Sequence, residues 1–105
     1  MRQDIDQQEW EELIATDEDA IILDVRTPGE VEEGYIPNMK HYDFFEGQEF
    51  VEALESMDKT KNYYIYCRSG NRSGQACDIM TQMGFESTFN LEGGFMNWSG
   101  EIIED

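Results

Sequence analysis

Two largely apolar runs constrain the fold of this chain more than any other feature of its sequence. "AIILDV", residues 20–25, and "YYIY", residues 63–66, lack the alternation of apolar and polar residues that marks a strand with one face in solvent. Such runs are typical of parallel strands that are buried on both faces. They predict an α/β protein in which helices cover both sides of a parallel sheet.

Helical periodicity fills much of the chain around these runs. Asp6 and Glu9 have the spacing of a capping box, and Trp10, Leu13 and Ile14 then fall on one helical face. Further helices are expected at residues 27–34, at 48–57, between the segment 67–72 and Gly84, and at 93–98. Further strands are expected at residues 39–45 and 87–91. Strands alternating with helices over 105 residues predict one domain, residues 1–105.

Acidic residues dominate the charge, with 24 Asp and Glu against seven Lys and Arg and a net charge of −17. Nucleic acids and anionic membranes are bound mainly through basic residues, so neither is expected as a partner. The acidity is interpreted first as a solvated surface. Docking of a basic partner protein is the alternative.

The remaining composition argues against several other classes of protein. No apolar run approaches the roughly 18 residues of a membrane span. The first ten residues, "MRQDIDQQEW", lack the apolar core of a secretory signal, which predicts a cytoplasmic protein. One histidine and two cysteines are too few for a disulfide framework or a clustered metal site. The sequence contains neither GxxxxGK[ST] nor GxGxxG, so no metal and no cofactor are expected.

The segment "YCRSGNRSG" carries the chemistry that the rest of the sequence lacks. Cys67 directly follows an apolar strand and precedes a helix, and open α/β sheets bind ligands at the carboxyl ends of their strands. The residues after it supply positive charge (Arg68 and Arg72), a glycine suited to positive φ (Gly70) and polar side chains (Ser69, Asn71 and Ser73). Backbone N–H groups at a helix start favour an anion. The pattern predicts a reactive thiolate in an anion-binding loop.

A comparison of electrostatic energies supports a thiolate at Cys67 despite the acidic surface. One arginine about 6 Å from the sulfur favours the thiolate by roughly 3 kcal/mol, or about two pK units. Screened carboxylates about 15 Å away oppose it far more weakly. Cys77 has no cationic neighbour in sequence and is expected to be an inert core residue. His41 has nothing in sequence that pairs it with Cys67 as a base, so a structural role is expected.

Taken together, "LDVRTPGE", "GYIP", "CRSGNR" and "NLEGGFMNW" resemble the rhodanese family, in particular single-domain thiosulfate sulfurtransferases. The resemblance implies a parallel five-stranded sheet with helices on both faces, and a persulfide on Cys67 during turnover. It implies that the backbone of residues 68–72 cradles the substrate, and that Asp24 and Arg26 support the site. Two departures are Tyr35, where the family has histidine, and Val31, near a usual aromatic residue.

The expected activity is transfer of sulfane sulfur from thiosulfate or a similar donor to cyanide or a thiol. The alternative is a sulfur-relay module that a desulfurase loads and that passes sulfur to an accepting protein. Phosphatase chemistry fits less well, because Cys67 to Arg72 is C-x4-R, one residue shorter than the C-x5-R loop of the phosphatase relatives. A non-catalytic interaction domain is disfavoured because the cysteine is retained.

Overall fold

The computed structural model describes residues 2–105 and contains one five-stranded, fully parallel sheet. The strands lie in the order β1-β5-β4-β2-β3. Their bounds are β1 (Arg2–Ile5), β2 (Ile21–Asp24), β3 (Met39–His41), β4 (Asn62–Tyr66) and β5 (Ser87–Leu91). The helices are α1 (Gln7–Thr16), α2 (Pro28–Val31), α3 (Gln48–Glu55) and α4 (Asn71–Gln82), with short 3-10 helices η1 (Phe44–Glu46) and η2 (Phe95–Asn97).

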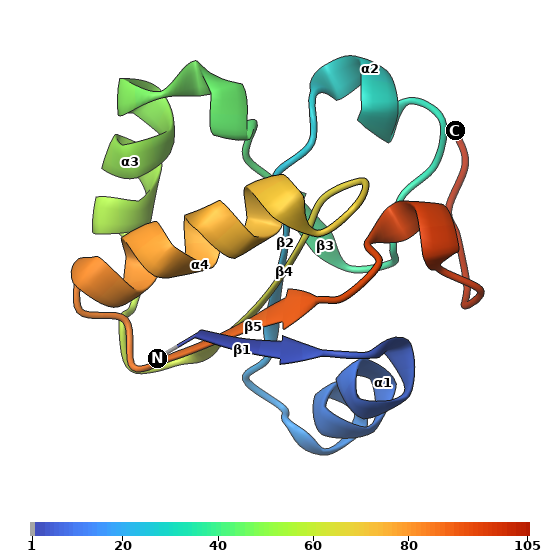
Figure 1. Cartoon of the computed structure of the whole chain (residues 1–105), viewed down its shortest axis with the longest axis horizontal. Helices are drawn as coiled ribbons and strands as arrows, with labels where there is room; N and C mark the ends of the chain where they lie inside the picture. Colours follow the sequence, from blue (N-terminus) through green and yellow to red (C-terminus); the bar gives the residue numbers. More distant parts are fainter. Residues whose placement is uncertain (1) are drawn as a thin grey trace.

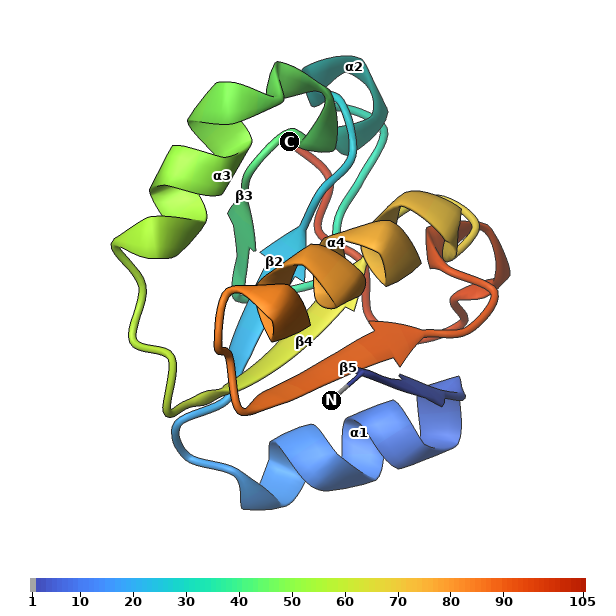
Figure 2. The same ribbon diagram turned by 60° about the vertical axis from the view of Figure 1, so that its left-hand side comes forward.

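Helices cover both faces of the sheet, as Figures 1 and 2 show from two directions. The side chains of β4 explain the division, because Tyr63 and Ile65 point into the core under α3 and α4, whereas Tyr64 and Tyr66 point into the core under α1. Trp10 of α1 packs edge-on against both of these tyrosines. An unbroken apolar strand is therefore what two covered faces require, and the predicted α/β class is confirmed.

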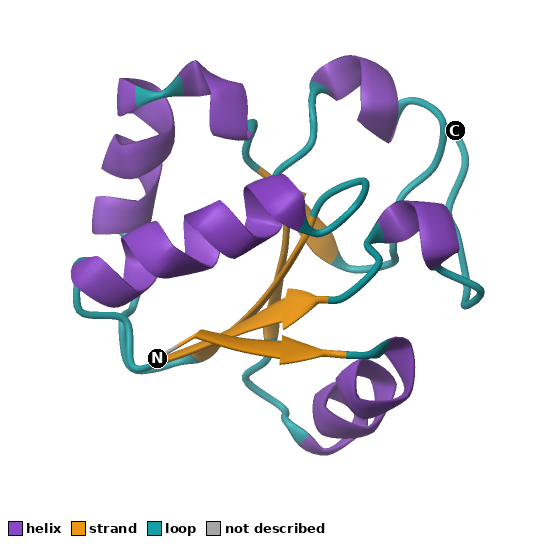
Figure 3. Ribbon diagram, viewed as in Figure 1, coloured by secondary structure: helices purple, strands orange, loops and turns teal. Residues whose placement is uncertain are grey.

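The helix starts follow the predicted local rules. Asp6 caps α1 by accepting a hydrogen bond from the backbone N–H of Glu9 at 2.9 Å. Thr27 and Glu30 form a complete capping box at the start of α2, where Pro28 occupies the first turn. The helices expected at residues 48–57 and after the Cys67 segment are also present, as Figure 3 shows by colour.

Two elements differ from the sequence prediction. Strand β1 was not expected, because "RQDI" is polar and only Ile5 is buried; it is an edge strand that gains its order by pairing with β5. The strand expected over residues 39–45 ends at His41, and Phe44 to Glu46 instead form η1 under a side-chain cap from Asp43. Within residues 2–105, no helix is long and apolar enough to cross a membrane.

Because β2, β4 and β5 pair in parallel, the carboxyl ends of these strands lie together at one end of the sheet. Asp24 ends β2, Cys67 follows β4, and Asn90 lies next to the last residue of β5. Helix α2, the Cys67 segment and η2 lie at this end of the sheet (Figure 1). Open parallel sheets bind their ligands at the carboxyl ends of their strands.

Candidate active site

The Cys67 loop, residues 67–72, turns the chain from the end of β4 into α4. Gly70 precedes the first residue of α4 with φ of 101°, a left-handed conformation that disfavours a side chain. This turn directs the backbone N–H of Gly70 at Cys67 Sγ, over 3.1 Å. The Cys67 sulfur therefore lies at the bottom of the loop, facing a backbone N–H group that would stabilise a thiolate.

Cys67 combines full burial with a lowered pKa. Its side chain is 0% exposed, and burial alone would raise the pKa of the thiol. Hydrogen bonds from the Ser73 side chain and from the backbone N–H groups of Ser73, Gly70 and Ser69 outweigh that effect, so the pKa lies below the ordinary cysteine value. A lowered pKa of Cys67 is what the sequence predicted. The main cause of the lowering is hydrogen bonding to the sulfur, whereas the sequence prediction relied on the charge of the arginines.

The two loop arginines lie in different environments. Arg72 makes a bidentate ion pair with Glu30 of α2, at 2.7 and 2.8 Å, and its guanidinium also lies 5.3 Å from the Phe45 ring centroid. The pair holds the pKa of the Glu30 carboxyl at about 2. Arg68 is exposed, and within residues 2–105 it has no ion-pair or side-chain hydrogen-bond partner. Arg68 is therefore the loop cation that is available to an incoming anion.

A buried ion pair supports the edge of the sheet beside the loop. Asp24 and Arg26 are 0% and 2% exposed, and Arg26 Nη2 donates to Asp24 Oδ2 at 2.6 Å. The Tyr66 hydroxyl donates to the same oxygen at 2.7 Å, and burial beside Asp24 raises the pKa of Tyr66. Arg26 also donates to the Gly34 carbonyl at 2.8 Å and stacks over the Phe95 ring at 4.3 Å. The two charges are thus fully paired, as their burial demands.

The turn before η2 locks against the outer side of the Cys67 loop. Phe95 N–H donates to the Cys67 carbonyl at 2.9 Å, and Met96 N–H donates to the Arg68 carbonyl at 3.0 Å. Gly94 makes this approach possible, because its φ is +61° and a Cβ there would overlap the Arg68 carbonyl and the Ser69 N–H. The paired glycines of "EGG" are the sequence signal that another stretch of backbone passes close by.

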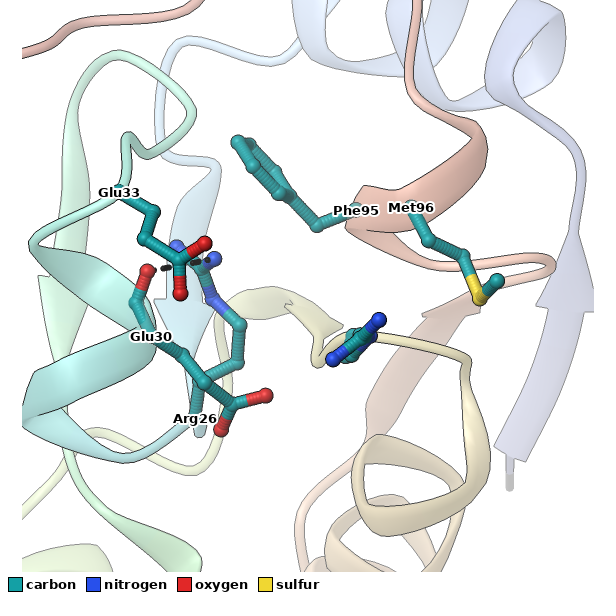
Figure 4. Close-up of a pocket in the computed structure, with 6 residues that line it drawn as sticks. Arg26, Glu30, Glu33, Phe95 and Met96 are labelled. Atoms are coloured by element: carbon teal, nitrogen blue, oxygen red, sulfur yellow. Dashed lines mark hydrogen bonds between the residues drawn. The ribbon is translucent and has the colours of Figure 1, made fainter.

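A cavity of about 200 Å³ opens beside the loop, between α2 and η2. Its walls carry two arginines, two glutamates, a phenylalanine and a methionine, namely Arg26, Arg68, Glu30, Glu33, Phe95 and Met96. Figure 4 shows Glu30 and Glu33 on one side of this space, with Phe95 and Met96 projecting from the other. A mixed lining of this kind suits a polar ligand with an apolar part better than a fully apolar one.

Three residues singled out in the sequence lie away from this cavity. Cys77 is 0% exposed in α4, and burial raises its pKa to about 12. His41 Nε2 hydrogen-bonds the backbone carbonyl of Arg26 at 2.7 Å, a contact that braces the Asp24–Arg26 turn. Tyr35 directs its hydroxyl to Asp105 at 3.3 Å and pairs through its backbone with Ile103. The departure at Tyr35 therefore affects the contact with the C-terminal segment.

Comparisons with known proteins agree with this geometry. The model of the rhodanese-like domain family matches residues 6–101. The chain belongs to the rhodanese-like domain family. Bacillus subtilis YtwF is 42% identical over 90 residues, covering 86% of this chain and 84% of YtwF. A protein of Allochromatium vinosum named sulfurtransferase is 33% identical over 99 residues, covering 94% of this chain and 90% of its own length.

A solved structure shows the same fold. The crystal structure of a rhodanese-like domain protein from Staphylococcus aureus superimposes with a TM-score of 0.84 at 30% sequence identity, covering 98% of each chain. The parallel five-stranded sheet implied by the resemblance is therefore that of a rhodanese-like domain.

Within this rhodanese-like domain, the structure brings together most of the residues selected from sequence. Gly70 and Ser73 contact the Cys67 sulfur, and Arg72 of the same loop pairs with Glu30. Asp24 and Arg26 pair with each other at the end of the neighbouring strand β2. Ser69 and Asn71 direct exposed side chains outward, so Ser69 contributes through its backbone N–H. The contacts to these residues also come from α2, β4, β5, η2 and the turn before η2. The residues that the sequence analysis did not select are Glu30, Tyr66, Asn90, Gly94, Phe95 and Met96.

Proposed function

We propose that this protein is a sulfurtransferase that carries sulfane sulfur as a persulfide on Cys67. The observation that supports the proposal is the environment of the buried Cys67 sulfur in a rhodanese-like domain. N–H and O–H donors point at this sulfur, and the pKa of the Cys67 thiol is lowered. Such a sulfur is a nucleophile without a separate general base.

The first step would load the cysteine. The Cys67 thiolate attacks the outer sulfur of a donor such as thiosulfate, a new S–S bond forms, and the donor S–S bond breaks. Sulfite leaves with the electron pair of that bond. Arg68 would bind the donor oxyanion, because it is the unpaired loop cation at the cavity. Arg72, paired with Glu30, would position the loop, and Asp24 and Arg26 would keep the neighbouring turn in place.

The second step would unload it. A thiophilic acceptor, cyanide or a thiolate, attacks the outer sulfur of the persulfide, and Cys67 leaves as the thiolate that the loop stabilises. Because Cys67 is 0% exposed and is absent from the cavity walls, donor and acceptor would reach the sulfur through a local movement of the rim. The reaction has two half-steps through one covalent intermediate, which gives ping-pong kinetics.

A sulfur relay between proteins is the second candidate, and one surface feature favours it. Phe45 and Met96, 66% and 60% exposed, flank the site from η1 and η2. Phe45 covers Arg72, and Met96 lines the cavity next to Arg68. Exposed apolar side chains at a reactive mouth fit a macromolecular sulfur donor or acceptor. The net charge of −17 would favour a basic one.

Intact mass spectrometry after thiosulfate treatment and a cyanide chase tests the proposal. We expect a gain of one sulfur atom that cyanide removes as thiocyanate. The gain should be absent in Cys67→Ala and present in Cys77→Ser. Loading only by a desulfurase or a protein persulfide would select the relay. No sulfur from thiosulfate, polysulfide or a protein persulfide would refute sulfur transfer altogether.

A further inference from the structure

Asn90 is a buried amide that lies between Phe89 and Leu91 in β5. It is 3% exposed, and its side chain lies on the α4 side of the sheet, behind the Cys67 loop. Its amide nitrogen donates to the Gly70 carbonyl at 3.1 Å and to Asp4 Oδ1 at 3.0 Å. Its amide oxygen accepts from the Ser73 hydroxyl at 2.5 Å. Every polar atom of the amide is therefore engaged.

The contacts fix which way the amide points. A flipped amide would turn its oxygen toward the Gly70 carbonyl and the Asp4 carboxylate, both of which are acceptors. Asp4 is itself held by Arg2, which donates to the same Oδ1 at 3.0 Å. The two strands place Asp4 and Asn90 in direct register, so β1 brings a carboxylate to the back of the loop. Asn90 Oδ1 must therefore face Ser73.

Ser73 then has one hydrogen and two acceptors for it. Its Oγ lies 2.5 Å from Asn90 Oδ1 and 3.4 Å from Cys67 Sγ. A hydroxyl donates a single hydrogen bond, so it serves one acceptor at a time. When Cys67 is a neutral thiol, the hydrogen can remain on the Asn90 side. When Cys67 is a thiolate, its charge draws the hydrogen toward sulfur.

We propose that Asn90 is a positioning residue that competes with Cys67 Sγ for the single hydroxyl hydrogen of Ser73. Asn90 thereby limits how strongly Ser73 stabilises the thiolate. The amide also supplies a place for the hydrogen whenever the sulfur bears no charge. The nucleophilicity of a thiolate falls as the pKa of its thiol falls. A thiolate that Ser73 stabilises less strongly is therefore the better nucleophile.

The competition would act in both half-reactions of the proposed sulfur transfer. As Cys67 attacks the donor, Sγ forms its new bond and loses its negative charge, and the departing group takes the donor's electron pair. The Ser73 hydrogen then returns to Asn90 Oδ1. When the acceptor removes the outer sulfur, Sγ regains the electron pair and the hydrogen swings back. No proton leaves the Ser73 oxygen in either direction.

Several charged or titratable groups surround this network. They are Arg2 and Asp4 of β1, Asp24 at the end of β2, Arg26 after it, Glu30 of α2, His41 of β3, Arg68 of the loop, and Arg72 and Asp78 of α4. Burial beside Asp24 raises the pKa of the Tyr66 hydroxyl, so Tyr66 stays neutral at the pH values at which a thiol titrates. Peptide mass mapping follows the labelling of Cys67 itself, so the pH midpoint reports on that thiol.

A double-mutant cycle read by the pH dependence of Cys67 alkylation tests the proposal. The full chain is treated with iodoacetamide across the pH range, and Cys67 labelling is followed by peptide mass mapping. Ser73→Ala should raise the midpoint by about one pH unit, because the thiolate loses a donor. Asn90→Leu should lower it by about half a unit, because Ser73 is released to the sulfur. In the Ser73→Ala background, Asn90→Leu should produce no lowering.

Two controls separate this competition from loop damage. Asn90→Leu also removes the donor to Gly70, and that effect would raise the midpoint equally in both backgrounds, so only the difference between backgrounds measures competition. Thr88→Val changes another buried polar residue of β5, two positions earlier on the same face, and should leave the midpoint unchanged. If circular dichroism shows that Asn90→Leu does not fold, Asn90→Ala takes its place in the cycle.

Equal shifts of Asn90→Leu in the two backgrounds, or none in either, would overturn the proposal. The inference rests on Cys67 as the reactive sulfur of the proposed function. Alkylation requires no sulfur donor, however, so failure of this cycle and failure of persulfide loading are separate results.

Discussion

Cys67 and Cys77 are ten residues apart and equally buried, yet their environments have opposite effects. Both side chains are 0% exposed. The pKa of Cys77 is raised to about 12 because burial is opposed by little else. The pKa of Cys67 is lowered because the N–H groups of the loop and the Ser73 hydroxyl point at its sulfur. Burial alone therefore does not decide the reactivity of a thiol; the donors aimed at the sulfur do.

The largest expected effect is a direct contrast between the two thiols. At pH 8 a thiol of pKa about 12 is ionised in about one molecule in ten thousand. We expect iodoacetamide to modify Cys67 about a thousandfold faster than Cys77 at that pH, measured by peptide mass mapping. Similar rates for both would show that the loop does not activate Cys67.

The second effect concerns the turn that holds the loop in shape. Gly94→Ala places a Cβ against the Arg68 carbonyl at a positive φ, and should lower the free energy of unfolding by about 2–4 kcal/mol. Gly29→Ala is the matched control, since no atom lies within 4 Å of its Cβ position, and should leave stability nearly unchanged. Urea unfolding measures both. In the Gly94 variant we also expect the two cysteines to become more alike in alkylation rate.

The third effect tests the ion pair beside the loop through pH. The pKa of Glu30 is lowered from 4.5 to about 2, so the pair stabilises the fold above pH 4.5 and loses that contribution as the pH falls toward 2. Glu30→Gln should cost about 1 kcal/mol at pH 7, since solvent partly screens the pair, and this cost should shrink as the pH falls from 4.5 through about 2. Glu33→Gln, which changes an exposed carboxylate on the same side of the cavity, serves as control. A pH-independent difference in unfolding free energy would contradict this assignment.

The smallest effect separates charge from hydrogen bonding at Cys67. Arg72→Ala should raise the alkylation midpoint by less than about half a unit, because Glu30 already neutralises the guanidinium. Ser73→Ala, which removes a hydrogen bond to the sulfur, should raise it more. The opposite ranking would restore arginine charge as the leading cause.

Local patterns predicted much of this molecule. The apolar runs at β2 and β4 indicated the covered parallel sheet, and the Cys67 loop followed from residues adjacent in sequence. Strand β1 was not predicted from the sequence because a polar edge strand has no apolar pattern of its own. The partner of Arg72 was not predicted for a different reason. Glu30 lies 42 positions away in the sequence, and it is one of 24 Asp and Glu residues that could have paired with Arg72. The role of Asn90 depends on three partners from three segments, which only the folded chain brings together.

The cradle around the sulfur is built largely from main-chain N–H groups, and this has a consequence for how the site can vary. The side chains of Arg68, Ser69 and Asn71 point outward while their backbone keeps the shape of the loop. Substitutions at these three positions would leave the sulfur chemistry in place and alter which molecule approaches it. If Cys67 carries sulfur as proposed, activation of the cysteine and choice of substrate become separable properties of one short loop, and substitutions could change the second without rebuilding the first.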